Sequence, residues 1–202
     1  MSFFENTRKP VGLGGKIMVA MMNFGHSAMA AWGLPFLQPA QDAMVLDCGC
    51  GGGANIKTLL KLCPKGRVQG IDYSAVSVEK ARKVNARAIA AGRCNVQQAS
   101  VTELPFEAGQ FDAVTAFETV YFWPELAQNF REVYRVLKPG GIFFICNEAN
   151  GETAKDDKWT QIINGMTIYT DTALKAYLEQ AGFCKIQSHK NKKGWLCVTA
   201  RK

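Results

Sequence analysis

The residues best suited to chemistry lie in one glycine-rich stretch, VLDCGCGGGAN, at Val45–Asn55. Gly49, Gly51 and Ala54 satisfy the pattern G-x-G-x-x-G/A, which lets a strand turn sharply into a helix and lets a ligand approach the backbone. An acidic residue, Asp72, follows about 20 residues later, where a carboxylate can bind ribose hydroxyl groups. The pattern predicts a site for an adenosine-containing ligand, and at this point a dinucleotide such as NAD fits as well.

The carboxylate of Asp47 separates these two kinds of ligand. It comes two residues before Gly49, so its charge would lie near any pyrophosphate bound at the loop. Two anions close together repel each other, whereas an ammonium and a sulfonium group would be attracted to the carboxylate. Asp47 therefore favours an adenosyl ligand with a cationic tail and no phosphate, although the side chain could instead organise the amides of the loop.

The segments around the loop alternate between apolar runs and helix-like stretches. The runs that predict strands are Met44–Gly49, Arg67–Asp72, Asn95–Ser100, Phe111–Phe117 and Ile142–Cys146. The stretches that predict helices are Ala54–Leu62, Ala75–Ala91, Pro124–Leu137 and Thr172–Ala181. Strands buried on both faces and alternating with helices indicate right-handed crossovers, and hence a parallel sheet with helices on both faces, a doubly wound α/β fold.

The C-terminal part follows another pattern. Two strand-like runs, FCKIQSHK and GWLCVTARK, flank a short polar turn at Asn191–Lys193, which predicts an antiparallel hairpin. We expect the whole chain, residues 1–202, to form a single domain in four parts. These parts are an N-terminal helical lid (1–42), a cofactor-binding core (43–147), a second lid segment (148–170), and a terminal helix with the hairpin (171–202).

Composition restricts the class of protein. The chain has 202 residues, 48% of them hydrophobic and 20% charged, which is typical of a globular protein rather than a disordered or membrane-spanning one. Its seven cysteines include no C-x₂-C pair, so we expect no metal site, reduced thiols and a cytoplasmic location. The net charge of +7 invites a nucleic-acid partner, but much of the excess lies near the C-terminal hairpin without a basic stripe interleaved with aromatic residues. Nucleic acid and membrane are therefore not the expected partners.

A set of ordered motifs resembles the class I S-adenosylmethionine-dependent methyltransferases, in particular their small-molecule type. The motifs are DCGCGGG (Asp47–Gly53), GIDYS (Gly70–Ser74), LPF (Leu104–Phe106), FDAV (Phe111–Val114), REVYRVLKPGG (Arg131–Gly141) and AGF (Ala181–Phe183). As a set they are specific, whereas no single one is. The resemblance implies a Rossmann-like methyltransferase fold with seven strands, the last of them antiparallel, and S-adenosyl-L-methionine as the cofactor.

The resemblance also implies roles for individual residues. Asp47 would face the cationic tail, and the backbone of Gly49, Cys50 and Gly51 would line the methionine part of the cofactor. Asp72 would bind the ribose, and Tyr73 would pack beside the adenine. Ser100 and Val101 stand where the family often has Asp-Ala reading the adenine edge, so the contact of a hydroxyl should be weaker than a charge-assisted one. The carbonyl of Phe117 would accept from the amino group of the cofactor.

The acceptor side is less well defined. His26 is the predicted base for an acceptor that must lose a proton, because the ordinary pKa of histidine, about 6.5, suits that role. A histidine at a helix surface is the alternative. Trp32, Tyr121, Trp123 and Tyr169 are the predicted substrate contacts. The segment Phe117–Val120 lacks the Asn/Asp-Pro-Pro-Tyr/Phe sequence of nucleobase-amine and glutamine methyltransferases, which argues against those acceptors.

The sequence thus predicts methyl transfer to a small molecule by in-line displacement. Methylation of RNA or protein, and a non-catalytic S-adenosylmethionine-binding module, are the alternatives. The acceptor, the acceptor atom and the oligomeric state are not encoded in any motif of the chain.

Overall fold

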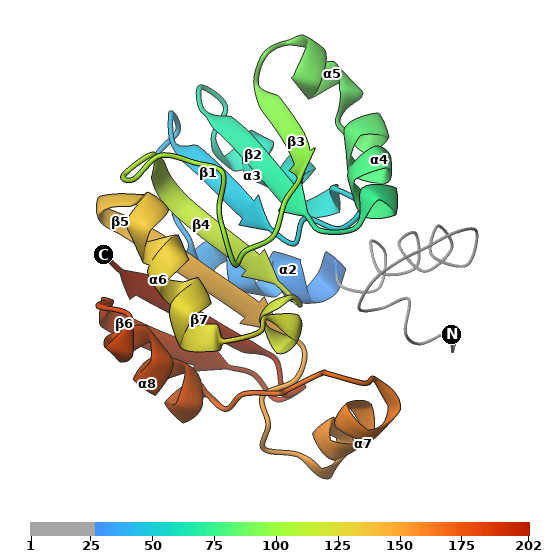
Figure 1. Cartoon of the computed structure of the whole chain (residues 1–202), viewed down its shortest axis with the longest axis vertical. Coiled ribbons are helices and arrows are strands. Elements are labelled where there is room, and N and C mark those ends of the chain that lie inside the picture. Colours follow the sequence, from blue (N-terminus) through green and yellow to red (C-terminus); the bar gives the residue numbers. More distant parts are fainter. Residues whose placement is uncertain (1–26) are drawn as a thin grey trace.

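The computed structural model describes residues 27–202, and within them a single seven-stranded sheet organises the molecule (Figure 1). The strands are β1 (Met44–Cys48), β2 (Arg67–Asp72), β3 (Cys94–Gln98), β4 (Phe111–Phe117), β5 (Leu137–Asn147), β6 (Cys184–Lys190) and β7 (Leu196–Arg201). Their order is β3-β2-β1-β4-β5-β7-β6. The pairs among β1 to β5 are parallel, and β7 is antiparallel to both β5 and β6. The predicted fold class, with its C-terminal antiparallel hairpin, is confirmed.

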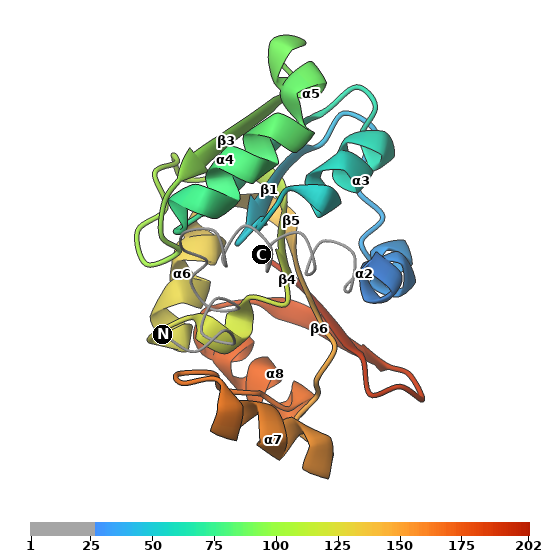
Figure 2. The same ribbon diagram turned by 90° about the vertical axis from the view of Figure 1, so that its right-hand side faces the viewer.

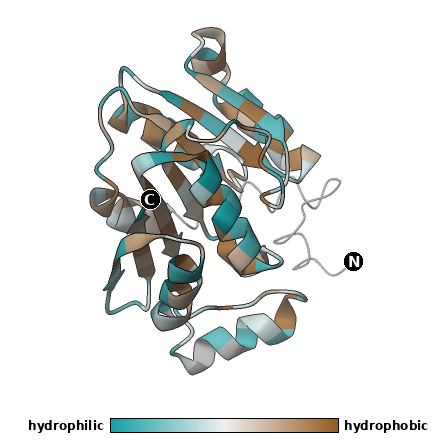
Figure 3. Ribbon diagram, turned by 60° about the vertical axis from the view of Figure 1, so that its left-hand side comes forward, coloured by the Kyte–Doolittle hydropathy of each residue, from teal (hydrophilic) through white to brown (hydrophobic). Residues whose placement is uncertain are grey.

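Helices cover both faces of this sheet, as expected for strands that are apolar on both sides (Figure 2). One face packs against α2 (Ser27–Gly33), α3 (Ala54–Leu62) and α4 (Ala75–Val84). The other packs against α6 (Leu126–Val136) and α8 (Asp171–Gln180). Successive residues of β5 alternate between the two cores, with Phe143 in the second and Phe144 in the first. Figure 3 shows hydrophobic residues on the central strands and polar residues on the outward sides of the helices.

The remaining elements are short. They are α5 (Ala86–Ala90), α7 (Ala154–Ile162), and two 3-10 turns, η2 (Leu34–Phe36) and η3 (Val120–Phe122). Helix α7 stands apart from the sheet on extended connections (Figure 1). It occupies the middle of the segment 148–170, where the sequence predicted a lid without a defined element.

Asn85 divides the helix that was predicted over Ala75–Ala91 into α4 and α5. Its side chain is buried, and its amide donates to the carbonyl of Gly53 at 3.0 Å and to that of Ala81 at 2.9 Å. Asparagine competes with helical hydrogen bonding when its side chain can bond to nearby backbone groups. The break therefore follows from a contact with the glycine loop, which no local pattern reveals.

Strand β5 begins earlier than the apolar run Ile142–Cys146 suggested. Leu137 pairs with Phe111 and Ile142 with Ala113, so the four residues between Leu137 and Ile142 form an irregularity in the ladder. The residues between the predicted helix, which ends one residue earlier at Val136, and the predicted strand thus form a bulge within β5 rather than a loop before it.

Candidate active site

The glycine loop follows β1 directly and begins α3. Gly49 has φ of +74°, and a Cβ atom there would lie 2.4 Å from Cγ2 of Thr119, so the position has no room for a side chain. Gly51 has φ of +52°, but a Cβ atom there would meet nothing within 4 Å. The N–H groups of Gly49 and Cys50 both donate to the carbonyl of Ile71 at 2.9 Å. The loop is therefore tied to the end of β2, and a side chain at Gly51 would extend into open space.

Asp72 ends β2 and holds this loop in place. Its Oδ2 accepts the N–H of Gly51 at 2.9 Å, and its Oδ1 accepts the N–H of Ser74 at 2.9 Å. Burial raises the pKa of Asp72, and the backbone hydrogen bonds from Ser74 and Gly51 oppose that rise. The side chain of Ser77 also donates to this carboxylate. A carboxylate has about four acceptor positions, so capacity remains for a ribose hydroxyl group.

Asp47 lies beneath the loop, with 1% of its surface exposed. Its Oδ1 accepts from the hydroxyl of Thr115 at 2.8 Å, whereas Oδ2 has no hydrogen-bond partner among the described residues. Burial raises the pKa of Asp47 to about 7, with the hydrogen bond from Thr115 opposing the rise and the charge of Asp72 adding to it. With a pKa of about 7, roughly half of the Asp47 side chains are protonated at neutral pH, whereas the sequence led us to expect a fully charged carboxylate.

A cavity of about 240 Å³ opens beside Asp72 at the carboxyl ends of β1, β2 and β3. It brings together six of the predicted site residues: Gly49, Asp72, Tyr73, Ser100, Val101 and Trp123. Tyr73 is 39% exposed, so its ring is available to a ligand. The hydroxyl of Ser100 lies 2.8 Å from that of Thr102 and accepts the Thr102 N–H at 3.2 Å, so part of its hydrogen-bonding capacity is used locally.

The other predicted cofactor residues lie next to this cavity rather than in its wall. Cys50 and Phe117 are both buried, and Phe117 pairs with Cys146 at the end of β4. Burial, followed by the charges of Asp47 and Asp72, raises the pKa of the Cys50 thiol well above its ordinary value. Cys50 is therefore a small apolar side chain and not a nucleophile.

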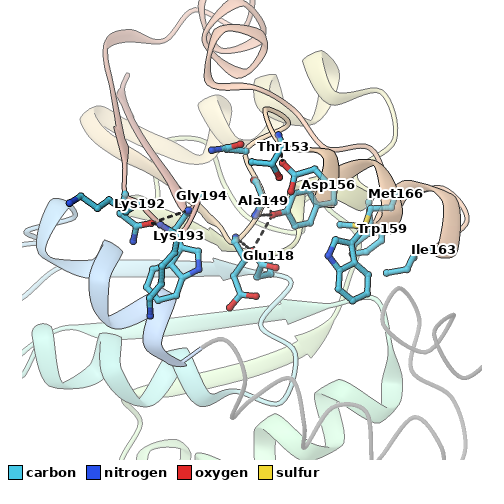
Figure 4. A pocket seen from close by; sticks show the side chains of 16 residues that line it. Glu118, Ala149, Thr153, Asp156, Trp159, Ile163, Met166, Lys192, Lys193 and Gly194 are labelled. Atoms are coloured by element: carbon cyan, nitrogen blue, oxygen red, sulfur yellow. Dashed lines mark hydrogen bonds between the residues drawn. The ribbon is translucent and has the colours of Figure 1, made fainter.

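A second and larger cavity, of about 860 Å³, begins where β4 ends (Figure 4). Four separate segments form it: the exits of β4 and β5, helix α7 with the residues after it, and the turn between β6 and β7. Its lining residues are Glu118, Tyr121, Phe122, Glu148, Ala149, Asn150, Thr153, Asp156, Trp159, Ile163, Met166, Asn191, Lys192, Lys193, Gly194 and Trp195. Phe122 lines both cavities, so the two adjoin at η3.

A hydrogen-bond network connects the β4 and β5 exits at the floor of this larger cavity. The hydroxyl of Tyr121 lies 3.2 Å from Oε1 of Glu118 and accepts the N–H of Ala149 at 2.9 Å. Oε1 of Glu118 also accepts the N–H of Glu148. Burial and then the charge of Glu118 raise the pKa of Tyr121 well above its ordinary value, so the phenol stays protonated. Glu118 itself has φ of +58°, an uncommon conformation for a residue with a side chain.

Of the four predicted substrate contacts, only Tyr121 lines the larger cavity. Trp123 lines the smaller one and stacks on Phe143 in the core. Trp32 packs against Trp195, which does line the larger cavity, and Tyr169 packs edge-on against Tyr177. His26, the predicted base, lies outside the described residues.

Sequence reasoning assigned no role to several residues that line this cavity, Glu118 and Trp159 among them. Glu118 and Glu148 each come directly after a buried strand, at the carboxyl edge of the sheet, where open α/β sheets bind ligands. That placement was the available signal for both. Trp159 belonged to the predicted second lid segment (148–170) without a role of its own, and Trp195 carried no signal, because only the tertiary fold brings α7 and the hairpin turn to the same cavity.

The described residues offer no sign of a metal centre or a membrane segment. Among residues 27–202, no group of three or more His, Cys, Asp and Glu side chains is placed to hold a metal ion. No helix in this part of the chain is long and apolar enough to cross a bilayer.

Comparison with known proteins gives a consistent result. A family described as "Methyltransferase domain" matches residues 46–145. Over 143 residues the chain is 29% identical to 24-methylenesterol C-methyltransferase 2 of Arabidopsis thaliana, and this match covers 70% of the chain and 38% of the relative. Over 151 residues it is 30% identical to O-methyltransferase cnsE of Penicillium expansum, and this match covers 73% of the chain and 54% of the relative. The chain thus spans about two fifths to half of the length of these relatives.

Solved structures show the same fold. A SAM-dependent methyltransferase from Aquifex aeolicus superposes with a TM-score of 0.76 at 18% identity, covering 92% of this chain and 97% of that one. The strand order, the glycine loop held by an acidic residue of β2, and the sequence matches agree with one another. The chain therefore belongs to the class I methyltransferases that use S-adenosylmethionine.

Proposed function

We propose that this protein transfers the methyl group of S-adenosylmethionine to a small molecule bound in the larger cavity. The observation that carries the proposal is that this cavity adjoins the cofactor side through Phe122. A volume of about 860 Å³ lies within the range of roughly 300–1,000 Å³ that is typical of small-molecule sites. Its lining combines aromatic and other apolar side chains with polar and charged ones that could orient a ligand.

The residues of the cofactor side fit a cationic ligand with an adenosine. The open space at Gly51 admits a ligand, and Asp72 has capacity for a ribose hydroxyl group. The unpartnered Oδ2 of Asp47 lies beneath the loop. A nearby positive charge would lower the raised pKa of Asp47 and so favour its charged form. S-adenosylmethionine supplies a methyl group that its sulfonium already activates for displacement.

The contribution of the chain to such a reaction is placement and proton acceptance. Holding an acceptor in line with the methyl group provides effective molarities of roughly 10⁵–10⁸ M. Phe122 and the floor around Tyr121 would fix the acceptor at the junction of the two cavities. For an acceptor that loses a proton, Glu118 is a second candidate base in addition to the predicted His26. Its carboxylate lines the larger cavity, and the contact with the hydroxyl of Tyr121 orients it.

A labelling experiment tests the acceptor class. The protein is incubated with S-adenosylmethionine carrying a deuterated methyl group and with a cell extract divided into small-molecule, RNA and protein fractions. We expect the label in the small-molecule fraction. Label found only in RNA or only in protein would contradict the proposal, and binding of S-adenosylhomocysteine without any transfer would indicate a non-catalytic module.

Two variants then separate the candidate bases. Glu118→Gln and His26→Ala should each keep the affinity for S-adenosylhomocysteine, measured by calorimetry. We expect the variant that removes the true base to lower turnover by roughly 10²–10⁴-fold, the usual contribution of a general base. Full turnover in both variants would show that the acceptor needs no base from these two residues.

A further inference from the structure

Three lysines with very different surroundings lie at the tip of the β6–β7 hairpin, Lys190 at the end of β6 and Lys192 and Lys193 in the turn. Lys190 lies 3.0 Å from Asp171 and also pairs with Glu152, so two carboxylates neutralise it. Lys192 and Lys193 line the larger cavity, and neither has an ion-pair partner among the described residues. The chain thus satisfies one ammonium group internally and presents two others at the wall of a cavity.

The turn that presents these two lysines is well ordered by its own hydrogen bonds. Oδ1 of Asn191 accepts the N–H of Lys193 at 2.9 Å and that of Trp195 at 3.1 Å. The carbonyl of Asn191 accepts the N–H of Gly194 at 3.0 Å. The ammonium group of Lys193 lies 4.7 Å from the centre of the Trp195 ring, and Trp195 also lines the cavity. A cation on the face of an indole is favourably placed, so the charge of Lys193 is held at the cavity wall rather than extended into water.

Charge in the cavity is arranged with opposite signs on different walls. The carboxylates come from the strand exits and α7, as Glu118, Glu148 and Asp156. Asp156 accepts the N–H of Gly151 at 2.9 Å, and Glu118 accepts the N–H of Glu148. In Figure 4, Lys192 and Lys193 lie toward one end of the cavity and Asp156 toward the other, with Glu118 between them.

The wall opposite the lysines provides an exposed aromatic surface. Trp159 is 45% exposed and lines the cavity beside Ile163 and Met166. Trp159 and Lys193 lie on opposite sides of Glu118 (Figure 4). A flat apolar body would cover the indole, while a negatively charged group would reach the lysines.

From this arrangement we infer that the acceptor is a flat, largely apolar molecule carrying an anionic substituent, which Lys192 and Lys193 bind. This inference rests on the proposed function, because it identifies the larger cavity as the acceptor site. It names a chemical class only, namely a carboxylate, sulfonate or phosphate on an aromatic or similarly flat body.

A pair of fluorescent probes tests the inference without any turnover. One is 8-anilino-1-naphthalenesulfonate, and the other is N-phenyl-1-naphthylamine, which has the same aromatic skeleton without the sulfonate. Both are titrated into the protein saturated with S-adenosylhomocysteine. We expect the anionic probe to bind about tenfold more tightly than the neutral one, as two partly exposed ion pairs would provide.

Variants assign this difference to particular residues. Lys192→Met combined with Lys193→Met should remove the preference for the anion and leave the neutral probe within about twofold. Lys61→Met combined with Lys65→Met removes the same charge from exposed positions on α3 and the loop after it, and should change neither affinity. Trp159→Ala should weaken both probes, which locates them in the cavity. Unchanged affinity for S-adenosylhomocysteine shows that each variant is folded.

Each outcome decides the question. Equal affinity of the two probes, no binding of the anionic probe, or a preference that survives the double hairpin variant would overturn the inference. Loss of the preference in the Lys61 and Lys65 variant as well would reduce it to an effect of net charge and overturn it too. Because the readout is binding, a failure to find methyl transfer would count against the proposed function and leave this result standing.

Discussion

The cofactor side of this site and the larger cavity, which we propose as its acceptor side, are built in different ways. The cofactor side consists of backbone amides, a positive-φ loop and two buried carboxylates, Asp47 and Asp72, all close to three adjacent parallel strands. The acceptor side consists of side chains from four segments that lie far apart in the sequence and meet through the pairing of β4 with β5 and of β5 with β7. The cofactor side depends mainly on the backbone and on these two carboxylates, so substitutions elsewhere in it would alter its recognition of a ligand little. The acceptor side depends on side chains, so substitutions there would change which acceptor it binds.

The largest expected effect comes from two glycines of the same loop. Gly49→Ala should lower the free energy of unfolding by roughly 2–5 kcal/mol, because it adds left-handed strain to a clash with Thr119. Gly51→Ala should cost only the strain, roughly 1–2 kcal/mol, yet weaken S-adenosylhomocysteine binding, since its Cβ enters the open space. Urea denaturation and calorimetry measure the two quantities. Equal destabilisation by both variants would break the distinction between a packed and a ligand-facing glycine.

The buried carboxylate under the loop should make stability depend on pH. Burial raises the folded-state pKa of Asp47 to about 7, above the value of about 3.9 expected for the unfolded chain. The folded state therefore binds more protons than the unfolded state between about pH 4 and pH 7, and stability falls as pH rises through that window. We expect the free energy of unfolding of the wild type to fall by roughly 2–4 kcal/mol over that window. Asp47→Asn should lack this fall, so the variant should be more stable than the wild type at pH 8. Parallel stability curves for the two proteins from pH 4 to pH 8 would refute the assignment.

Asp72 provides the corresponding test of ligand binding. Asp72→Ala should weaken S-adenosylhomocysteine binding by roughly 1.5–3 kcal/mol, through lost charge-assisted hydrogen bonds to ribose and a loosened loop amide at Gly51. Asp112→Ala is the matched control, because Asp112 pairs with Lys138 near the start of β4 and should leave the affinity unchanged. An unaltered affinity in a folded Asp72→Ala protein would contradict its role.

The smallest effect is expected on the acceptor side. Tyr121→Phe should lower the free energy of unfolding by roughly 1 kcal/mol, because the N–H of Ala149 loses its partner, and should leave S-adenosylhomocysteine binding unchanged. Tyr177→Phe, in α8, serves as the control for removing a phenol elsewhere. A large loss of cofactor affinity in Tyr121→Phe would show that the two sides are coupled more tightly than their separate construction suggests.

The same contrast explains what could be predicted from the sequence. The loop, Asp72 and the alternation of strands and helices are local patterns, so the fold class and a ligand site at Gly49 and Asp72 followed from them. The roles of Tyr73, Ser100 and Val101 came instead from the resemblance to the methyltransferase family.

The division of a helix at Asn85 did not follow from a local pattern, because its cause is a hydrogen bond to Gly53, far away in the sequence. Neither did the convergence of Trp159 and Trp195 on one cavity, since no spacing along the chain reports which loops meet in space.

Predicted acceptor contacts were chosen by residue type, and that criterion is weak. Trp123 and Tyr169 are aromatic and adjoin strand or helix ends, but neither lines the larger cavity: Trp123 lines the smaller one and stacks on Phe143, and Tyr169 packs against Tyr177. Large aromatic side chains supply much of any core, so their presence near a site does not distinguish packing from binding.

Lys190 joins three parts of the acceptor side, because it pairs with Glu152 before α7 and with Asp171 at the start of α8 while standing at the end of β6. Such pairs weaken as ionic strength rises, since dissolved ions screen partly exposed charges. The hairpin turn should then be held less firmly against α7 in concentrated salt than in dilute buffer. The shape of the acceptor cavity, and with it the KM for even an uncharged acceptor, should therefore respond to salt, while the cofactor side, tied by backbone hydrogen bonds, should not.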